Sequence, residues 1–267
     1  MLQHDKNLGI IAKSIENKIK NELSNMMKND YEEYKNFFKI FGLQLKFGIY
    51  NNYGMDKDKL KDLILFYSAN KKDLISLKEY VSNMSENQDK IYYANGETPD
   101  KIDLLPQVEL VKDKGFDILY FTDYMDEFAI QTLMEYEGKK FINVCSKDLN
   151  LSSDEENKKL DKLNSEHSDL FKAMKESLAD SVSEVRFTNR LKSHPVCLTT
   201  EGDVSVEMEK VFNAMPTDNK LNVLYKNDKD ELAKYTKILY AQARLIEGLT
   251  IDNPTEISNL VCDLISK

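Results

Sequence analysis

The chain has 267 residues, of which 41% are hydrophobic and 31% are charged. This composition is typical of a folded protein, and the length predicts two domains. The net charge of −9 is spread along the chain, which argues against nucleic acid as a partner, because a phosphate backbone requires a concentrated basic surface. No run reaches the roughly 20 apolar residues that cross a bilayer. Because the first residues also lack the apolar core of a secretory signal, we expect a cytoplasmic protein without a membrane partner.

The cysteines and histidines form no reactive or metal-binding pattern. The cysteines are far apart and lie among apolar residues, which favours buried, reduced thiols. They are Cys145, Cys197 and Cys262. A nucleophilic cysteine would need a histidine partner, and the positions of His4, His167 and His194 indicate none. His167 lies on an apolar helical stripe without a second ligand four residues away, so we expect a packing residue and no metal site.

Residues 1–88 are predicted to be helical. Apolar side chains recur at helical spacing in three stripes, which predicts three helices. The stripes are Leu8, Ile11, Ile15 and Ile19, then Tyr34, Phe37, Phe38 and Phe41, then Leu60, Leu63, Ile64 and Tyr67. Asp30 is a candidate N-cap of the second helix, and the Asn51-Asn52-Tyr53-Gly54 segment separates the second from the third.

Residues 89–150 change to an alternation of strands and helices. The β-rich runs 91–94, 116–121 and 141–144 are separated by helical stretches around Val108 and Ile130. This order predicts a small parallel sheet covered by helices, an α/β/α sandwich.

Ligands often bind at the strand ends of such a sheet, where Thr122 and Asp123 follow the second strand. An alternative function is therefore a small-ligand-binding enzyme that uses Asp123, Asp126 and Glu127 as acid or base groups. Carboxylates at a helix start are more often solvated caps, and no glycine-rich phosphate loop is present.

Residues 151–168 are highly charged and predict a connector that leads into a helix. The apolar stripe of this helix is Leu160, Leu163, His167, Leu170, Phe171, Met174 and Leu178. We expect residues 169–267 to form a mixed α+β domain with strands near 185–187, 195–198 and 221–225. Between the last two strands, an amphipathic helix is predicted whose apolar stripe is Val204, Met208, Val211, Phe212 and Met215.

The chain ends with two amphipathic helices that are separated by Gly248 and Asn253-Pro254. Such a helical hairpin could form a two-fold dimer interface, or it could pack back on the local strands. The residues of the expected interface are Leu232, Tyr235, Ile238, Leu239, Gln242, Ile246, Ile257, Leu260, Val261, Leu264 and Ile265.

Several strings resemble the heat-shock protein 90 family in its bacterial form. They are Asp126-Glu127-Phe128, Gln131-Thr132-Leu133, Tyr136-Glu137-Gly138-Lys139-Lys140, Val185-Arg186-Phe187-Thr188-Asn189-Arg190-Leu191, His194-Pro195-Val196-Cys197-Leu198 and Met208-Glu209-Lys210-Val211-Phe212-Asn213-Ala214-Met215. The resemblance covers nearly the whole chain. It implies a fragment of a molecular chaperone, in which residues 1–150 are the rear part of the middle domain and residues 169–267 are the C-terminal dimerisation domain.

Met1-Leu2-Gln3 resembles the end of the family's catalytic loop, Ser-Arg-Glu-Met-Leu-Gln. In the family, the arginine and glutamine of this loop act on ATP and Mg²⁺ bound to a separate N-terminal domain. The resemblance implies that Gln3 is the remnant of this loop and that the chain alone has no ATPase activity and no cofactor.

The resemblance also implies two surfaces that contact unfolded or partly folded client proteins. Their residues are Glu127, Phe128, Gln131, Val204, Met208, Val211, Phe212 and Met215. Methionine and aromatic side chains suit such contacts because they adapt to many partners, although a stripe of this kind is more often part of a core. Further implied partners are a second copy of the chain and a bacterial chaperone of the heat-shock protein 70 type.

Overall fold

The computed structural model describes residues 6–147, 149, 151–191, 194–200 and 231–265. Within it the chain divides into two compact units, and neither is one continuous stretch of sequence. Unit 1 comprises Met1–Asp103 and Phe116–Ile142, and unit 2 comprises Leu104–Gly115 and Asn143–Lys267. The expected strand 221–225 and the expected amphipathic helix with Val204 to Met215 lie outside the described residues.

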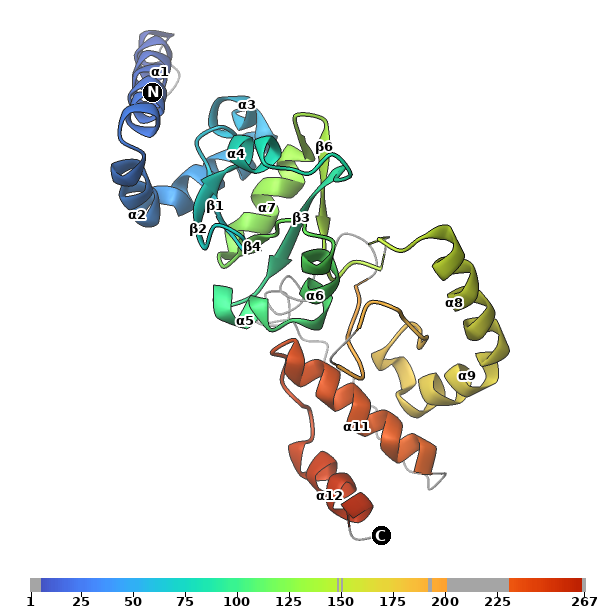
Figure 1. Cartoon of the computed structure of the whole chain (residues 1–267). Helices are drawn as coiled ribbons and strands as arrows, with labels where there is room; N and C mark the ends of the chain where they lie inside the picture. The colour runs from blue at the N-terminus through green and yellow to red at the C-terminus, as the bar shows by residue number, and fades with distance from the viewer. Residues whose placement is uncertain (1–5, 148, 150, 192–193, 201–230, 266–267) are drawn as a thin grey trace. The chain divides into compact units, whose positions relative to one another are not determined.

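Unit 1 begins with two long helices, α1 (Lys6–Asn29) and α2 (Tyr31–Tyr50), as predicted (Figure 1). Asp30 is the N-cap of α2, because its Oδ1 accepts a hydrogen bond of 3.0 Å from the Glu33 amide. After α2 the chain forms the short 3₁₀ helix η2 (Asn51–Gly54) and the four-residue helix α3 (Lys57–Leu60).

The prediction of a third helix with the stripe Leu60, Leu63, Ile64 and Tyr67 is wrong. Its stripe continues beyond α3 into strand β1 (Leu65–Ser68), which forms an antiparallel hairpin with β2 (Asp73–Ser76). Residues 63–66 form an unbroken apolar run that is buried throughout. Such a run has no period of its own, so periodicity cannot distinguish a buried strand from a buried helix.

Strands β3 (Lys90–Asn95), β4 (Leu119–Phe121) and β6 (Lys139–Asn143) correspond to the three predicted strands, and the short strand β5 (Glu135–Tyr136) pairs with β6. The sheet has the order β2-β1-β4-β3-β6-β5. Strands β3 and β4 are parallel, whereas β1 is antiparallel to β4. The mixed α and β class is confirmed, but the sheet is larger than predicted and mixed in direction, because the β1–β2 hairpin was assigned to a helix.

Among the described residues, four further helices connect these strands and bear out the expected alternation. They are α4 (Leu77–Ser82), α5 (Pro99–Asp103) and α7 (Tyr124–Leu133) of unit 1 and α6 (Pro106–Asp113) of unit 2. Helix α7 packs against both α2 and β4 in unit 1 (Figure 1). The core of unit 1 therefore lies between these helices and the sheet.

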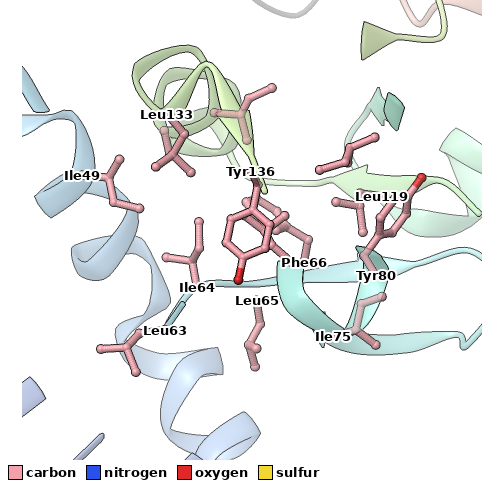
Figure 2. Close-up of a cluster of buried hydrophobic side chains, with 14 of the residues drawn as sticks. Ile49, Leu63, Ile64, Leu65, Phe66, Ile75, Tyr80, Leu119, Leu133 and Tyr136 are labelled. Atoms are coloured by element: carbon pink, nitrogen blue, oxygen red, sulfur yellow. The ribbon is translucent and has the colours of Figure 1, made fainter. Parts of the chain in front are cut away.

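Figure 2 shows this core, to which α2, the sheet and α7 all contribute. Ile49 extends from the end of α2, Leu133 from the end of α7, and Phe66 from β1. The Tyr80 hydroxyl donates to the Asp117 carbonyl at 2.6 Å and accepts from the Tyr92 amide at 3.1 Å. A buried tyrosine needs such partners, and these hydrogen bonds tie α4 to strand β3 and to the segment that leads into β4.

In unit 2, the helix that was predicted to follow the charged connector starts earlier than expected and is divided into two. Most of the expected connector 151–168 is α8 (Asp154–Glu166), which starts with a capping box between Ser153 and Glu156. Helix α9 (Ser168–Ser177) follows after a break at His167, where φ is −110°. His167 is exposed and so is not the partly buried residue that was expected, but its ring packs edge-on against Phe187 with 5.5 Å between ring centroids.

The segment 182–198 forms no strand, so the two strands expected near 185–187 and 195–198 are wrong among the described residues. Its backbone is fixed by side chains. Arg190 is buried, and its guanidinium donates to the carbonyls of Ser146, at 2.6 Å, Lys147 and Leu149, at 2.7 Å. The guanidinium thus satisfies three backbone carbonyls of residues 146–149 and ties them to this segment.

Unit 2 ends with α11 (Glu231–Ile246) and α12 (Pro254–Ile265), the two predicted terminal helices. Helix α11 packs against α9 and α12. The expectation of three buried thiols holds for Cys145 alone, since Cys197 is partly exposed and Cys262 is exposed. None of the described helices is both long and apolar enough to cross a membrane.

Candidate functional site

Helix α7 carries the candidate residues of unit 1, and two carboxylates fix its start. Asp123 Oδ1 accepts a hydrogen bond of 3.0 Å from the Met125 amide. In return, Asp126 Oδ2 accepts one of 3.1 Å from the Asp123 amide, which completes a capping box. Both candidate acid or base groups are therefore engaged in holding the helix, as expected if they are caps.

Asp126 also forms a buried ion pair with Lys46 of α2. The Lys46 ammonium lies 5.4 Å from the Phe38 ring centre and 5.3 Å from that of Phe66. Burial raises the pKa of Asp126, and the Lys46 charge opposes this rise. Because Oδ1 of Asp126 has no other hydrogen-bonding partner among the described residues, Lys46 is its main compensation for burial.

Glu127 faces the interior of unit 1. It is 3% exposed, and its carboxylate accepts hydrogen bonds from the Tyr93 hydroxyl at 3.3 Å and the Asn95 amide group at 3.2 Å. A side chain that is buried in this way is not accessible to the client protein that Glu127 was predicted to contact. Its position links α7 to strand β3.

Phe128 and Gln131 lie on the outer side of α7, where Phe128 is partly buried and Gln131 is exposed. The Phe128 ring contacts Tyr50 of α2, with 5.4 Å between centroids and 60° between planes. Tyr124, one turn earlier on α7, and Phe47, one turn earlier on α2, are both exposed. We call Phe47, Tyr50, Tyr124 and Phe128 the aromatic surface.

Sequence reasoning found Phe128 through the resemblance and missed Phe47 and Tyr50. One signal for them was present. Helix α2 continues to place aromatic residues after Phe41 at positions outside its buried stripe of Tyr34, Phe38, Lys46 and Ile49. A helix that is apolar beyond one stripe has either a second packing partner or an exposed apolar face.

The other expected client surface, with Val204, Met208, Val211, Phe212 and Met215, lies outside the described residues, as does Gln3. Within the described ranges, no three His, Cys, Asp or Glu side chains come together in a way that could hold a metal ion.

The expected dimer residues lie on α11 and α12, which an ion pair of 2.7 Å between Lys237 and Glu256 connects. Tyr235, Gln242 and Val261 are exposed. The remaining described side chains of the set are partly exposed; they are Ile238, Leu239, Ile246, Ile257 and Leu260. For Leu232, Leu264 and Ile265 the structure describes the backbone in its helix, and their side chains lie outside the description.

Helix α11 buries a different set of side chains within unit 2. Thr236, Ala241 and Ala243 of the helix are buried, as is Glu247 directly after its end. The predicted dimer stripe runs beside this buried stripe and retains accessible apolar area. Local packing thus leaves the predicted interface partly open.

Comparisons with known proteins agree with the resemblance. A family model described as "Hsp90 protein" matches residues 1–233. The chaperone protein HtpG of Clostridium perfringens is 50% identical and that of Bacillus subtilis is 48% identical, each over 99% of this chain and 45% of the relative. The chain thus spans less than half the length of these relatives.

A solved middle domain of a protein described as a heat shock protein of Plasmodium falciparum is 28% identical to the chain. It aligns with a TM-score of 0.49 over 54% of this chain and 59% of that one. The family model and the bacterial relatives each cover most of the chain. The chain therefore belongs to the Hsp90 family.

Proposed function

We propose that this chain is the part of an Hsp90-type molecular chaperone that holds unfolded or partly folded client proteins and forms a homodimer. The observation that carries the proposal is the Phe128 ring, which stands partly exposed beside Tyr50 on a helix anchored by buried charges. Exposed rings on a rigid base bind apolar segments at low entropic cost, because little must be ordered on binding.

The proposal extends to residues that the structure does not describe. We assign a second client surface to Val204, Met208, Val211, Phe212 and Met215 on the basis of the resemblance. A heat-shock protein 70 type chaperone is proposed as a further partner on the same basis. We also propose residues 1–150 and 169–267 as the middle-domain and dimerisation parts of the longer relatives.

ATP and Mg²⁺ belong, in this proposal, to a separate domain of such a chaperone. Gln3 would contribute to the loop that touches the ATP phosphate there. The three carboxylates near the start of α7 are engaged in structural contacts, which favours a binding role over the alternative of acid or base catalysis. We expect the chain alone to hydrolyse no ATP.

The client function is tested by the aggregation of a heat-unfolded model protein, followed by light scattering with and without this chain. We expect the wild-type chain to suppress scattering and Phe128→Ser to weaken the suppression by severalfold. Phe41→Ser is the control, because Phe41 is an exposed phenylalanine of α2 that stacks on Phe37 instead. A wild-type chain without any suppression, or equal loss in both variants, would contradict the proposal.

The dimer is tested by sedimentation equilibrium. We expect Tyr235→Glu with Val261→Glu to convert the dimer to a monomer, because both exposed side chains lie on the predicted interface and two like charges would face their copies. Leu245→Glu is the matched control, since Leu245 is exposed on α11 but outside the predicted set. A monomeric wild-type chain, or a dimer that tolerates both glutamates, would refute the interface.

A further inference from the structure

Asn95, at the end of strand β3, is the sole asparagine of the chain that is followed by glycine. An asparagine before glycine is especially prone to deamidation, because glycine has no side chain that keeps its amide nitrogen away from the asparagine side chain. The fold requires this glycine, since a Cβ atom at Gly96 would lie 2.7 Å from Cγ1 of Ile102 in α5. The close approach of α5 therefore maintains a reactive pair of residues at the end of β3.

Deamidation would convert the Asn95 side chain to a carboxylate. The Gly96 nitrogen loses its proton and attacks Cγ of Asn95, the bond between Cγ and Nδ2 breaks, and ammonia leaves with that proton. Water then opens the cyclic imide. Aspartate forms when the new bond between Cγ and the Gly96 nitrogen breaks, and isoaspartate forms when the bond from that nitrogen to the Asn95 carbonyl carbon breaks. Water is the co-reactant, and Asn95 is partly exposed to it.

In the native fold, hydrogen bonds engage both groups that must react. The Gly96 amide donates to the Phe121 carbonyl at 3.1 Å, directly after the pairing of Asn95 with Phe121 between β3 and β4. The Asn95 side chain donates from Nδ2 to Glu127 Oε2 at 3.2 Å. The attack requires the Gly96 nitrogen to leave the Phe121 carbonyl and the Asn95 side chain to leave Glu127. The reaction therefore proceeds from molecules in which the end of β3 has opened.

The product cannot restore the native contact with helix α7. An ionised aspartate side chain has no hydrogen to donate, and at position 95 it would face the Glu127 carboxylate, which is buried. Two carboxylates that share a buried site repel each other, so keeping both ionised is costly. Conversion of Asn95 would thus replace an attraction between β3 and α7 with a repulsion.

We propose that Asn95 is a deamidation site that the native fold protects, and that its conversion to aspartate releases the Glu127 contact between β3 and α7. Converted molecules open more readily than intact ones, so the damage accumulates in chains that have been partly unfolded. The inference concerns unit 1 alone and does not depend on the proposed client function.

The protection is tested by incubating the full chain in mildly alkaline buffer, with and without enough urea to unfold it. Mass spectrometry of proteolytic peptides then measures aspartate and isoaspartate at each asparagine. In urea, Asn95 should convert faster than Asn70, an exposed asparagine that is followed by Lys71. Without urea, conversion of Asn95 should be at least about tenfold slower, because only opened molecules react. Equal rates with and without urea would refute the protection, and conversion in urea no faster than that of Asn70 would refute the site.

The effect on α7 is tested with variants that are unfolded in urea and followed by circular dichroism. We expect Asn95→Asp to lower the folding equilibrium constant at least about tenfold. Asn95→Ser is the matched control with a smaller loss, because serine also lacks the amide but adds no charge and keeps a donor. Adding Glu127→Gln to Asn95→Asp should recover most of the loss, since the glutamine amide can donate to the new carboxylate.

The comparison between these variants decides the second half of the proposal. If Asn95→Asp costs no more than Asn95→Ser, or if Glu127→Gln restores no stability, the release of the contact with α7 is refuted. If Asn95→Asp alone does not fold, a folded double variant supports the proposal and an unfolded one contradicts it.

Discussion

The buried ion pair between Lys46 and Asp126 allows a quantitative prediction. The Lys46→Met substitution keeps most of the side-chain volume among the surrounding rings but leaves the Asp126 carboxylate, which is 2% exposed, without its cation. Removal of one partner of a buried pair typically costs about 3–5 kcal/mol, because the remaining charge is uncompensated. We expect this loss in the free energy of unfolding, measured with urea and followed by circular dichroism.

The same helix offers a matched control in Lys35. The side chains of Lys35 and Lys46 are both 9% exposed, but Lys35 pairs with Asp73, which is 48% exposed, and with the exposed Glu32. After Lys35→Met, both carboxylates remain hydrated, so we expect a cost of about 1 kcal/mol or less. Equal costs for Lys35→Met and Lys46→Met would show that lost side-chain contacts, and not the unpaired buried charge, determine the effect.

The Asp126 charge also makes the effect depend on pH. Burial raises the pKa of Asp126, and removal of Lys46 takes away the charge that opposes the rise. A folded-state pKa above the unfolded value stabilises the fold at low pH, and this contribution is lost as the pH rises through the folded-state pKa. The cost of Lys46→Met should therefore be smaller near about pH 5 than near about pH 8. The double variant Lys46→Met, Asp126→Asn should recover stability at the higher pH, because asparagine can still accept from the Asp123 amide.

Two further predictions concern backbone contacts. Gly54→Ala should destabilise unit 1 by about 2–4 kcal/mol, because Gly54 has φ of +75° and an added Cβ would meet Thr132. Gly138→Ala should cost only about 1 kcal/mol, because Gly138 also has φ of +75° but no atom lies within 4 Å of an added Cβ. Similar urea midpoints for the two alanine variants would contradict the contact. Arg190→Lys should cost about 2–4 kcal/mol and speed amide exchange at Lys147, since a lysine cannot serve all three carbonyls that the guanidinium binds. Unchanged exchange would mean that Arg190 does not hold this segment.

Local signals in the sequence predicted much of the fold. The Asp30 cap located the start of α2, and helical periodicity identified α6, α7 and the two terminal helices. These features depend on neighbouring residues and can be recognised without tertiary context. The capping box of Ser153 and Glu156 is equally local, but the high charge of residues 151–168 predicts a connector, so the helix was expected to start later than it does.

Other features depended on contacts between distant residues. The apolar run 63–66 leads into strand β1 because β4 and β2 lie on either side of β1, and the run's own pattern has no period that predicts this. At the candidate site, the sequence indicated α7 but not which of its neighbouring residues face inward. Glu127 and Phe128 are adjacent, yet one binds Tyr93 and Asn95 in the interior while the other meets Tyr50 on α2.

This division of α7 separates stability from binding. Asp126 and Glu127 face inward and fix the helix to α2 and β3, whereas Tyr124 and Phe128 face outward beside Phe47 and Tyr50. Substitutions of the outer rings should therefore weaken client binding with little change in the free energy of unfolding. Substitutions of the inner charges should weaken both, because the rings lose their fixed spacing when α7 is no longer anchored. Variants from the two sides of one helix thus distinguish a binding residue from a residue that positions it.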